Sequence, residues 1–147
     1  MKRLLSVILC TAIMLICVGC SSNQKISYDA YEKLIKGLEN MGYKVESKDV
    51  EKSILSGERK WLTLNENENI SVYLYENNEK MEEDASYLSF DGGTYNNGKN
   101  SIIVEWVSYP HFFKSENMIV LYVGENTDIV SILEELVGPQ FAGYYRQ

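Results

Sequence analysis

Cysteine is absent from most of this chain, because all three cysteines, Cys10, Cys17 and Cys20, fall within the first 20 of the 147 residues. The rest of the chain therefore cannot form a disulfide bond or a thiolate metal site, and a folded domain there depends on its hydrophobic core. Histidine is nearly absent as well, since His111 is the only one. A zinc site would need several carboxylates, an unusual ligand set. We therefore expect no metal and no cofactor.

Positive charge is scarce too. The chain has 14 lysines and arginines against 21 aspartates and glutamates, a net charge of −7. It lacks the basic run that neutralises phosphates in nucleic acid binding, so we expect no nucleic acid partner. A phosphate-binding glycine loop is missing as well. Gly92-Gly93 is followed by Thr94 and Tyr95, whereas such a loop would continue with lysine and serine or threonine at a helix start.

The longest apolar run is too short for a permanent membrane anchor. It extends from Leu4 to Val18 and covers about 15 residues, whereas a membrane-spanning helix needs roughly 20. Lys2 and Arg3 precede the run, and small residues follow it. Two cations, a short apolar segment and small residues are typical of a secretory signal peptide.

The segment Cys17-Val18-Gly19-Cys20 resembles the lipobox of bacterial lipoproteins. The resemblance implies that Cys20 receives a diacylglycerol thioether and that a dedicated peptidase cuts before it, with Gly19 in the narrow peptidase pocket. One position departs from the family pattern, because Cys17 stands where leucine is usual. The alternatives are an ordinary signal peptide cut elsewhere and an uncleaved N-terminal helix.

The lipobox interpretation sets the predicted domain boundaries and location. We predict a signal peptide at residues 1–19, a lipidated tether at 20–25 and a single domain at 26–147. Two acyl chains make membrane binding durable, so the chain is expected on the extracytoplasmic face of the cell membrane, held by the lipid on Cys20. Loss of Lys2 and Arg3 from the 14 basic residues leaves 12 against 21 acidic ones, or about −9.

The apolar spacing of the predicted domain indicates both helices and strands. The three- and four-residue spacing of amphipathic helices recurs in three segments, and Ser27 and Gly42 are suitable start and stop signals for the first. We predict helices at residues 27–42, 78–88 and 128–137. We predict strands at 43–45, 61–64, 70–75, 102–107 and 118–123, with a hairpin turn at 65–69 and a loop at 110–117. Residues 47–58 fit either a helix or a strand.

This order of elements, α-β-β-β-α-β-β-α, favours the α+β class. We expect a mainly antiparallel sheet with the helices packed on one face. Residues 118–123 are apolar on both faces and should form a central strand. The acidic run Glu82-Glu83-Asp84 is interpreted as a solvated helix face, since it lacks the alternating spacing of a calcium-binding loop. Asp91-Gly92-Gly93 and residues 138–143 are interpreted as turns.

The strongest candidate for a binding site is aromatic. Trp106, Tyr109, His111, Phe112 and Phe113 crowd one predicted strand and the loop after it. Bulky rings on a loop supply contact area at low entropic cost and are common in binding sites. Two other interpretations stay open. Phe112 and Phe113 could fold back onto the core, or the loop could insert into lipid headgroups.

No convincing catalytic motif accompanies these residues, so we predict a non-enzymatic binding or accessory module of the cell envelope. Its partner would be an envelope protein or a cell-wall component. The alternative is an envelope hydrolase or transferase with His111 as general base, although no nucleophile-elbow glycines surround a nearby serine. A substrate-capturing lipoprotein of a transporter ranks last, because the chain is short for a two-lobed clamp.

The segment from Ile103 to Gly143 adds a second resemblance. It contains Glu105-Trp106-Val107, Pro110-His111-Phe112, residues 119–124 and Gln140-Phe141-Ala142-Gly143. In these motifs it is similar to the C-terminal part of small uncharacterised lipoproteins of Gram-positive bacteria. The resemblance covers about a third of the chain and implies a cell-envelope location without implying an activity.

Overall fold

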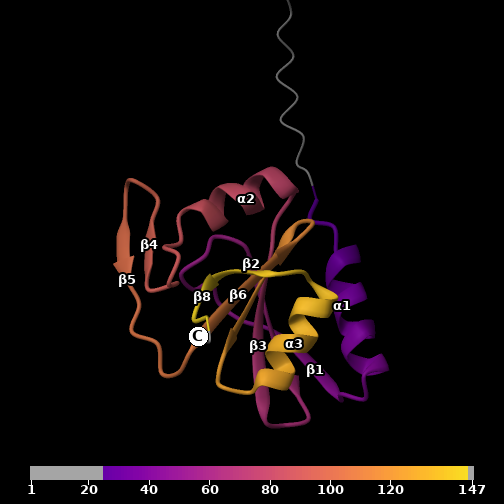
Figure 1. The fold of residues 1–147 in the computed structure, drawn as a ribbon. Helices are drawn as coiled ribbons and strands as arrows, with labels where there is room; N and C mark the ends of the chain where they lie inside the picture. The colour runs from indigo at the N-terminus through magenta and orange to yellow at the C-terminus, as the bar shows by residue number, and fades with distance from the viewer. Residues whose placement is uncertain (1–24, 146–147) are drawn as a thin grey trace, which may run out of the picture.

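The computed structural model describes residues 25–145 of the chain (Figure 1). The predicted signal peptide, Cys20 and most of the predicted tether lie outside these residues. Within the described range, no helix combines the length and the apolar character needed to cross a bilayer.

A six-stranded antiparallel sheet forms the centre of the fold, with strand order β1-β2-β3-β7-β6-β8. Its strands are β1 (Val45–Asp49), β2 (Glu58–Leu64), β3 (Glu68–Leu74), β6 (Pro110–Ser115), β7 (Met118–Val123) and β8 (Gln140–Gly143). A second, small sheet pairs β4 (Thr94–Asn96) with β5 (Ser101–Ile103). The helices are α1 (Asp29–Asn40), α2 (Asn78–Ser86) and α3 (Thr127–Leu136). The α+β class and the mainly antiparallel sheet are therefore confirmed.

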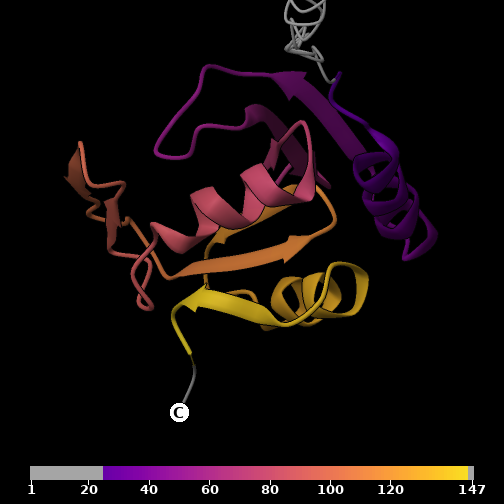
Figure 2. The same cartoon turned by 90° about the horizontal axis from the view of Figure 1, so that it is seen from above.

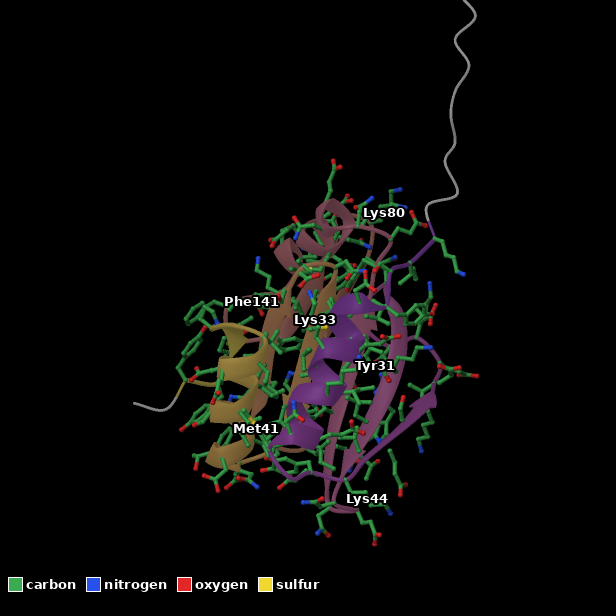
Figure 3. All side chains as sticks on the ribbon, turned by 90° about the vertical axis from the view of Figure 1, so that its right-hand side faces the viewer. Tyr31, Lys33, Met41, Lys44, Lys80 and Phe141 are labelled. Carbon is green, nitrogen blue, oxygen red and sulfur yellow. The ribbon has the colours of Figure 1, made fainter. Side chains whose placement is uncertain are left out.

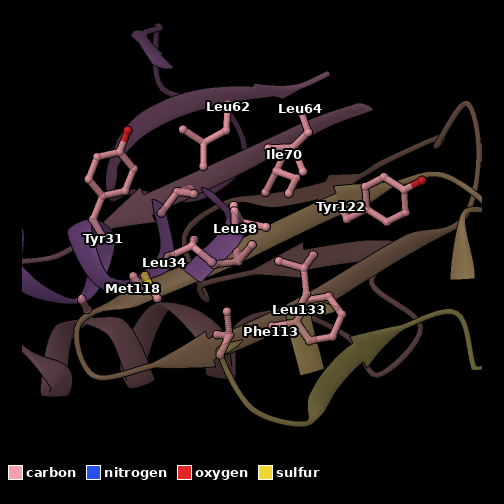
Figure 4. Packing of buried hydrophobic residues seen from close by; sticks show 14 of the residues in the cluster. Tyr31, Leu34, Leu38, Leu62, Leu64, Ile70, Phe113, Met118, Tyr122 and Leu133 are labelled. Carbon is pink, nitrogen blue, oxygen red and sulfur yellow. The ribbon is translucent and has the colours of Figure 1, made fainter. Parts of the chain in front are cut away.

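Both faces of the sheet are covered, each with its own hydrophobic cluster. Successive side chains of a strand point to opposite faces, so Phe113 joins the cluster beneath α1 and α3, whereas Phe112 joins the cluster beneath α2. Figure 3 shows α1 and α3 side by side, and Figure 4 shows the cluster that they cover. Figure 2 shows α2 and α3 on opposite sides of the sheet. The expectation that all helices pack on one face is therefore wrong for α2.

The three predicted helices are confirmed, with local signals that explain their bounds. Leu34 and Leu38 lie four residues apart and are buried on the inner side of α1. Gly42, just after α1, has a φ of 90°, a left-handed conformation that glycine adopts at little cost. The side chains of Asn77 and Asn126 accept hydrogen bonds from backbone N–H groups in the first turns of α2 and α3, which satisfies donors that a helix start leaves unpaired.

The predicted hairpin and central strand are also confirmed. β2 pairs with β3 around a tight turn, with Leu62 opposite Ile70. β7 lies between β3 and β6 and is buried on both faces. β1 is an edge strand that is exposed at four of its five positions. The segment that fits either helix or strand, residues 47–58, contains the end of β1, an irregular stretch and the first residue of β2.

The predicted strand at 102–107 and the predicted loop at 110–117 are both wrong. Only residues 102 and 103 of the first segment lie in a strand, and that strand, β5, pairs with β4 rather than with β7. Ile103 and Val107 are 81% and 99% exposed, whereas Phe112 and Phe113 are completely buried. Because the two rings are buried, β6 rather than the predicted strand pairs with β7. Pro110 is tolerated in β6 because it is the first residue of the strand.

The segment after α3 also differs from its prediction. Gln140–Gly143 was expected as a turn, yet it forms the short edge strand β8, which pairs with β6. Gly138 has a positive φ of 128° between α3 and β8, so the predicted helix stop is confirmed. The pairing is long-range, and the short segment carries no local signal for it.

The acidic run on α2 is not fully solvated. Glu82 and Glu83 are exposed, but Asp84 is only 3% exposed. Its carboxylate accepts hydrogen bonds from the hydroxyls of Tyr75 and Tyr95, both at 2.7 Å, and from the backbone N–H of Ser56 at 2.8 Å. The expectation of a solvated face is therefore wrong at Asp84, which follows buried Met81 by three residues and shares its inward stripe. Burial, followed by the hydrogen bond to Asp84, raises the pKa of both tyrosines.

Candidate binding cavity

A cavity of about 460 Å³ opens between α3 and the edge of the sheet formed by β6 and β8. This volume lies within the range of small-molecule sites in proteins. Three tyrosines, Tyr109, Tyr144 and Tyr145, line it together with Glu125 and Glu134. His111 and Gln140 also line the cavity, and their side chains are hydrogen-bonded to each other.

Strand pairing brings the tyrosines together. Tyr109 precedes β6 and Tyr144 follows β8, and the backbone N–H of Tyr144 donates to the carbonyl of Pro110 at 2.7 Å. The rings of Tyr109 and Tyr144 stack with centroids 3.8 Å apart and planes 14° apart. The Tyr145 ring stacks on Phe90 at 4.9 Å. Each of these tyrosines remains about 40% exposed, so ring surface is available to a ligand.

Gly143 is the reason that β6 and β8 can approach so closely before Tyr144. Its φ is 107°, and a Cβ atom built there would lie 2.1 Å from the carbonyl oxygen of Pro110. Only glycine fits this combination of backbone conformation and contact. The position of the tyrosine pair therefore depends on a residue without a side chain.

His111 is buried, and each ring nitrogen lies near an oxygen atom of the protein. Nδ1 lies 2.8 Å from Oε1 of Gln140, and Nε2 lies 3.3 Å from the carbonyl oxygen of Gly124. The Gln140 amide donates through Nε2 to the carbonyl of Tyr144, which orients Oε1 toward the imidazole, so Nδ1 is the donor in this pair. Among residues 25–145, no carboxylate or hydroxyl forms a hydrogen bond with either nitrogen. The imidazole therefore orients the Gln140 side chain in this arrangement.

The other predicted site residues lie elsewhere. Phe112 and Phe113 are core residues on opposite faces of the sheet, so the interpretation that they fold onto the core is the one that the structure fits. Trp106 is half-buried, donates from Nε1 to the carbonyl of Gly92 at 2.9 Å and meets Phe112 edge to face. Gly92 is part of the predicted turn, in which Asp91 accepts from the backbone N–H of Gly93. Of the five predicted residues, Tyr109 and His111 line the cavity.

Sequence reasoning missed the remaining lining residues. Tyr144 and Tyr145 are adjacent aromatics near the C-terminal end of the sequence, and their spacing to β6 follows from the unpredicted strand β8. Glu125 and Glu134 lie before and within α3, where they read as ordinary surface acids. A pair of aromatics directly after Gly143 was the only local signal for this part of the site.

The cavity is negatively charged. Among residues 25–145, no lysine or arginine lines it, and neither the Glu125 nor the Glu134 carboxylate has a hydrogen-bond or ion-pair partner there. Burial raises the pKa of the Tyr145 hydroxyl, and the Glu134 carboxylate raises it further. A positively charged group would therefore be favoured in the cavity over an anion.

A polar network fixes the start of α3 beside the cavity. The Tyr122 hydroxyl donates to Oε2 of Glu68 at 2.9 Å and accepts from the backbone N–H of Asn126 at 3.2 Å. Asn126 Nδ2 donates to Oε1 of the same glutamate. Burial, and then the hydrogen bond to Glu68, raises the pKa of Tyr122 to about 12. These contacts hold the residues that connect β7 to α3, including Glu125.

Comparison with known proteins identifies no relative, since no protein-family model, curated protein or solved structure matches the chain. Among residues 25–145, no group of three or more histidine, cysteine, aspartate or glutamate side chains is arranged to hold a metal ion. The function must therefore be argued from the chain's own residues.

Proposed function

We propose that this chain is an extracytoplasmic lipoprotein, anchored to the cell membrane through Cys20, whose domain is a non-enzymatic binding module of the cell envelope. The ligand site is the cavity lined by Tyr109, Tyr144 and Tyr145, and its occupant is part of an envelope protein or a cell-wall component. The observation that carries the binding role is a cavity of about 460 Å³ with three partly exposed tyrosine rings. The sequence motif at Cys20 supports the anchor.

Binding fits this cavity better than hydrolysis does. A general base needs a nitrogen within reach of the proton that it takes from a nucleophile. Both nitrogens of His111 face amide or carbonyl oxygens of the protein, which supports a positioning role for the ring. The resemblance of residues 103–143 to envelope lipoproteins is consistent with the proposed location.

The anchor is tested by Cys20→Ser. Without the thiol no diacylglycerol thioether can form, so we expect an unprocessed precursor that retains Met1 and incorporates no labelled fatty acid. Intact-mass analysis of the cellular protein and fatty-acid labelling give the two measurements. Cys10→Ala is the matched control, because it removes a thiol from the predicted signal peptide and should leave lipidation unchanged. Fatty-acid incorporation by the Cys20→Ser protein would contradict the proposed anchor.

The binding role is tested by placing a photoreactive phenylalanine analogue at Tyr109 in intact cells. We expect a defined adduct after illumination, because the Tyr109 ring is 42% exposed and lines the cavity. The control position is Lys48, which is exposed on β1 at the opposite edge of the sheet. Adducts of equal yield at both positions, or none at Tyr109, would show that the cavity is not where the domain meets its ligand.

A further inference from the structure

We propose that the cavity recognises an organic ammonium group, meaning a protonated amine or a quaternary ammonium carried by the ligand. This inference rests on the proposed binding role of the same cavity and names the chemistry of its occupant. Two features of the site lead to it: its unpaired carboxylates and its tyrosine rings.

The carboxylates provide the first argument. Some surface glutamates are paired with lysines, since Lys33, Lys80 and Lys114 each contact one, and others are not. Glu125 and Glu134 have no such partner within residues 25–145, and they line the same cavity from the two ends of one segment. Two unpaired negative charges beside one cavity attract a cation and repel phosphate or carboxylate ligands.

The tyrosine rings provide the second argument for a cationic ligand. The face of an aromatic ring carries negative electrostatic potential and attracts cations within about 6 Å of the ring centroid. The fold uses this contact elsewhere, since Lys60 Nζ lies 5.1 Å from the Tyr28 ring centroid and Arg59 lies 5.2 Å from that of Trp61. Within the described residues, no protein cation occupies this position over Tyr109, Tyr144 or Tyr145. Their exposed ring surface is therefore open to a cation from the ligand.

Several polar side chains at the base of the cavity form hydrogen bonds within the protein. The Gln140 amide donates to the carbonyl of Tyr144, and the Nδ1–H of His111 donates to Gln140. The Tyr145 hydroxyl donates to the carbonyl of Gln140 at 3.1 Å. The hydroxyls of Tyr109, Thr127 and Tyr144 also line the cavity and can donate to a ligand, so hydrogen-bond donors alone do not decide the charge of the ligand. An ammonium group needs acceptors and ring faces, and the cavity supplies both.

The test uses two small probes of the same shape and different charge, choline and 3,3-dimethyl-1-butanol. The full-length chain in non-ionic detergent is titrated with each, and binding is followed by calorimetry or by tyrosine resonances in NMR spectra. We expect choline to bind at least about tenfold more tightly than its neutral counterpart. Because the carboxylates are exposed, added salt should weaken choline binding. Equal binding of the two probes, or no binding of choline, overturns the proposal.

Two matched variants of α3 test whether choline binds in the cavity. Glu134→Gln should weaken choline binding by about threefold to tenfold, whereas Glu135→Gln, the same change at the next position of α3 and outside the cavity lining, should stay within about twofold. Both variants should unfold at the wild-type temperature. Equal losses in the two variants would mean that net charge, and not the cavity, attracts choline, which also overturns the proposal.

The two proposals fail separately. A specific adduct at Tyr109 in cells without choline binding would retain the binding role and remove the ammonium specificity. Choline binding without any adduct at Tyr109 would retain the cation site and remove the proposed envelope ligand.

Discussion

Asp84→Ala is expected to lower the free energy of unfolding by about 3–5 kcal/mol, because it removes the acceptor of two buried hydroxyls and one partly buried backbone N–H, and each stranded donor costs about 1–3 kcal/mol. These donors are the hydroxyls of Tyr75 and Tyr95 and the backbone N–H of Ser56. They come from the residue after β3, from β4 and from the irregular segment before β2, so Asp84 ties α2 to three separate parts of the chain. The loss is a large fraction of the roughly 5–15 kcal/mol that stabilises a typical domain. Urea denaturation followed by circular dichroism measures it.

Two further variants test whether the loss of stability comes from the hydrogen bonds of Asp84 and not from any change made on α2. Glu83→Gln alters the neighbouring, exposed residue and should cost no more than about 0.5 kcal/mol. Tyr95→Phe should be destabilising in the wild-type chain and nearly neutral in the Asp84→Ala chain, because its hydroxyl has then already lost its acceptor. Additive losses from Asp84→Ala and Tyr95→Phe would contradict the network.

Gly143→Ala should be comparably damaging, with a loss of about 3 kcal/mol or more from backbone strain and steric overlap together. The new Cβ would lie 2.1 Å from the carbonyl oxygen of Pro110, and the φ of 107° is unfavourable for alanine. Because the opposing atom belongs to the backbone, the overlap is relieved only by moving β8 away from β6. That movement displaces Tyr144 and Tyr145, so choline binding should be lost as well.

Gly42→Ala is the matched control for strain alone. Gly42 has a φ of 90°, yet nothing lies within 4 Å of its added Cβ. Gly42→Ala should lower the free energy of unfolding by about 1 kcal/mol. It should leave choline binding intact, because Gly42 lies at the end of α1. If the two alanine variants were equally stable by urea denaturation, the close approach of β8 to β6 would not be the constraint described here.

Local sequence patterns predicted the parts of the fold that depend on local contacts. α1 and α3 were predicted from their apolar stripes and capping residues, and the β2–β3 hairpin from its polar turn. β6 and β8 were missed because their identity as strands depends on burial against distant segments. His111, Phe112 and Phe113 follow a proline and do not alternate in polarity, so the strand period was hidden.

The same limit applies to the functional residues. Aromatic crowding indicated Tyr109 and His111, but Tyr144 and Tyr145 reach the cavity only through the pairing of β8 with β6. Asp84 was assigned to the surface because of its charge. It nevertheless lies on the buried side of α2 with Met81 and Ala85. Its burial depends on two tyrosines from other elements, which the spacing within α2 cannot reveal.

The exposed edge strand β1 has a consequence for encounters between copies of this protein. A strand with one unpaired side can dock onto the same strand of a neighbouring copy. Glu46, Lys48 and Asp49 carry charges along this strand and are exposed. Stacking of two copies would bring these hydrated side chains together and strip their water, so β1 disfavours intermolecular sheet growth and helps crowded copies to stay separate.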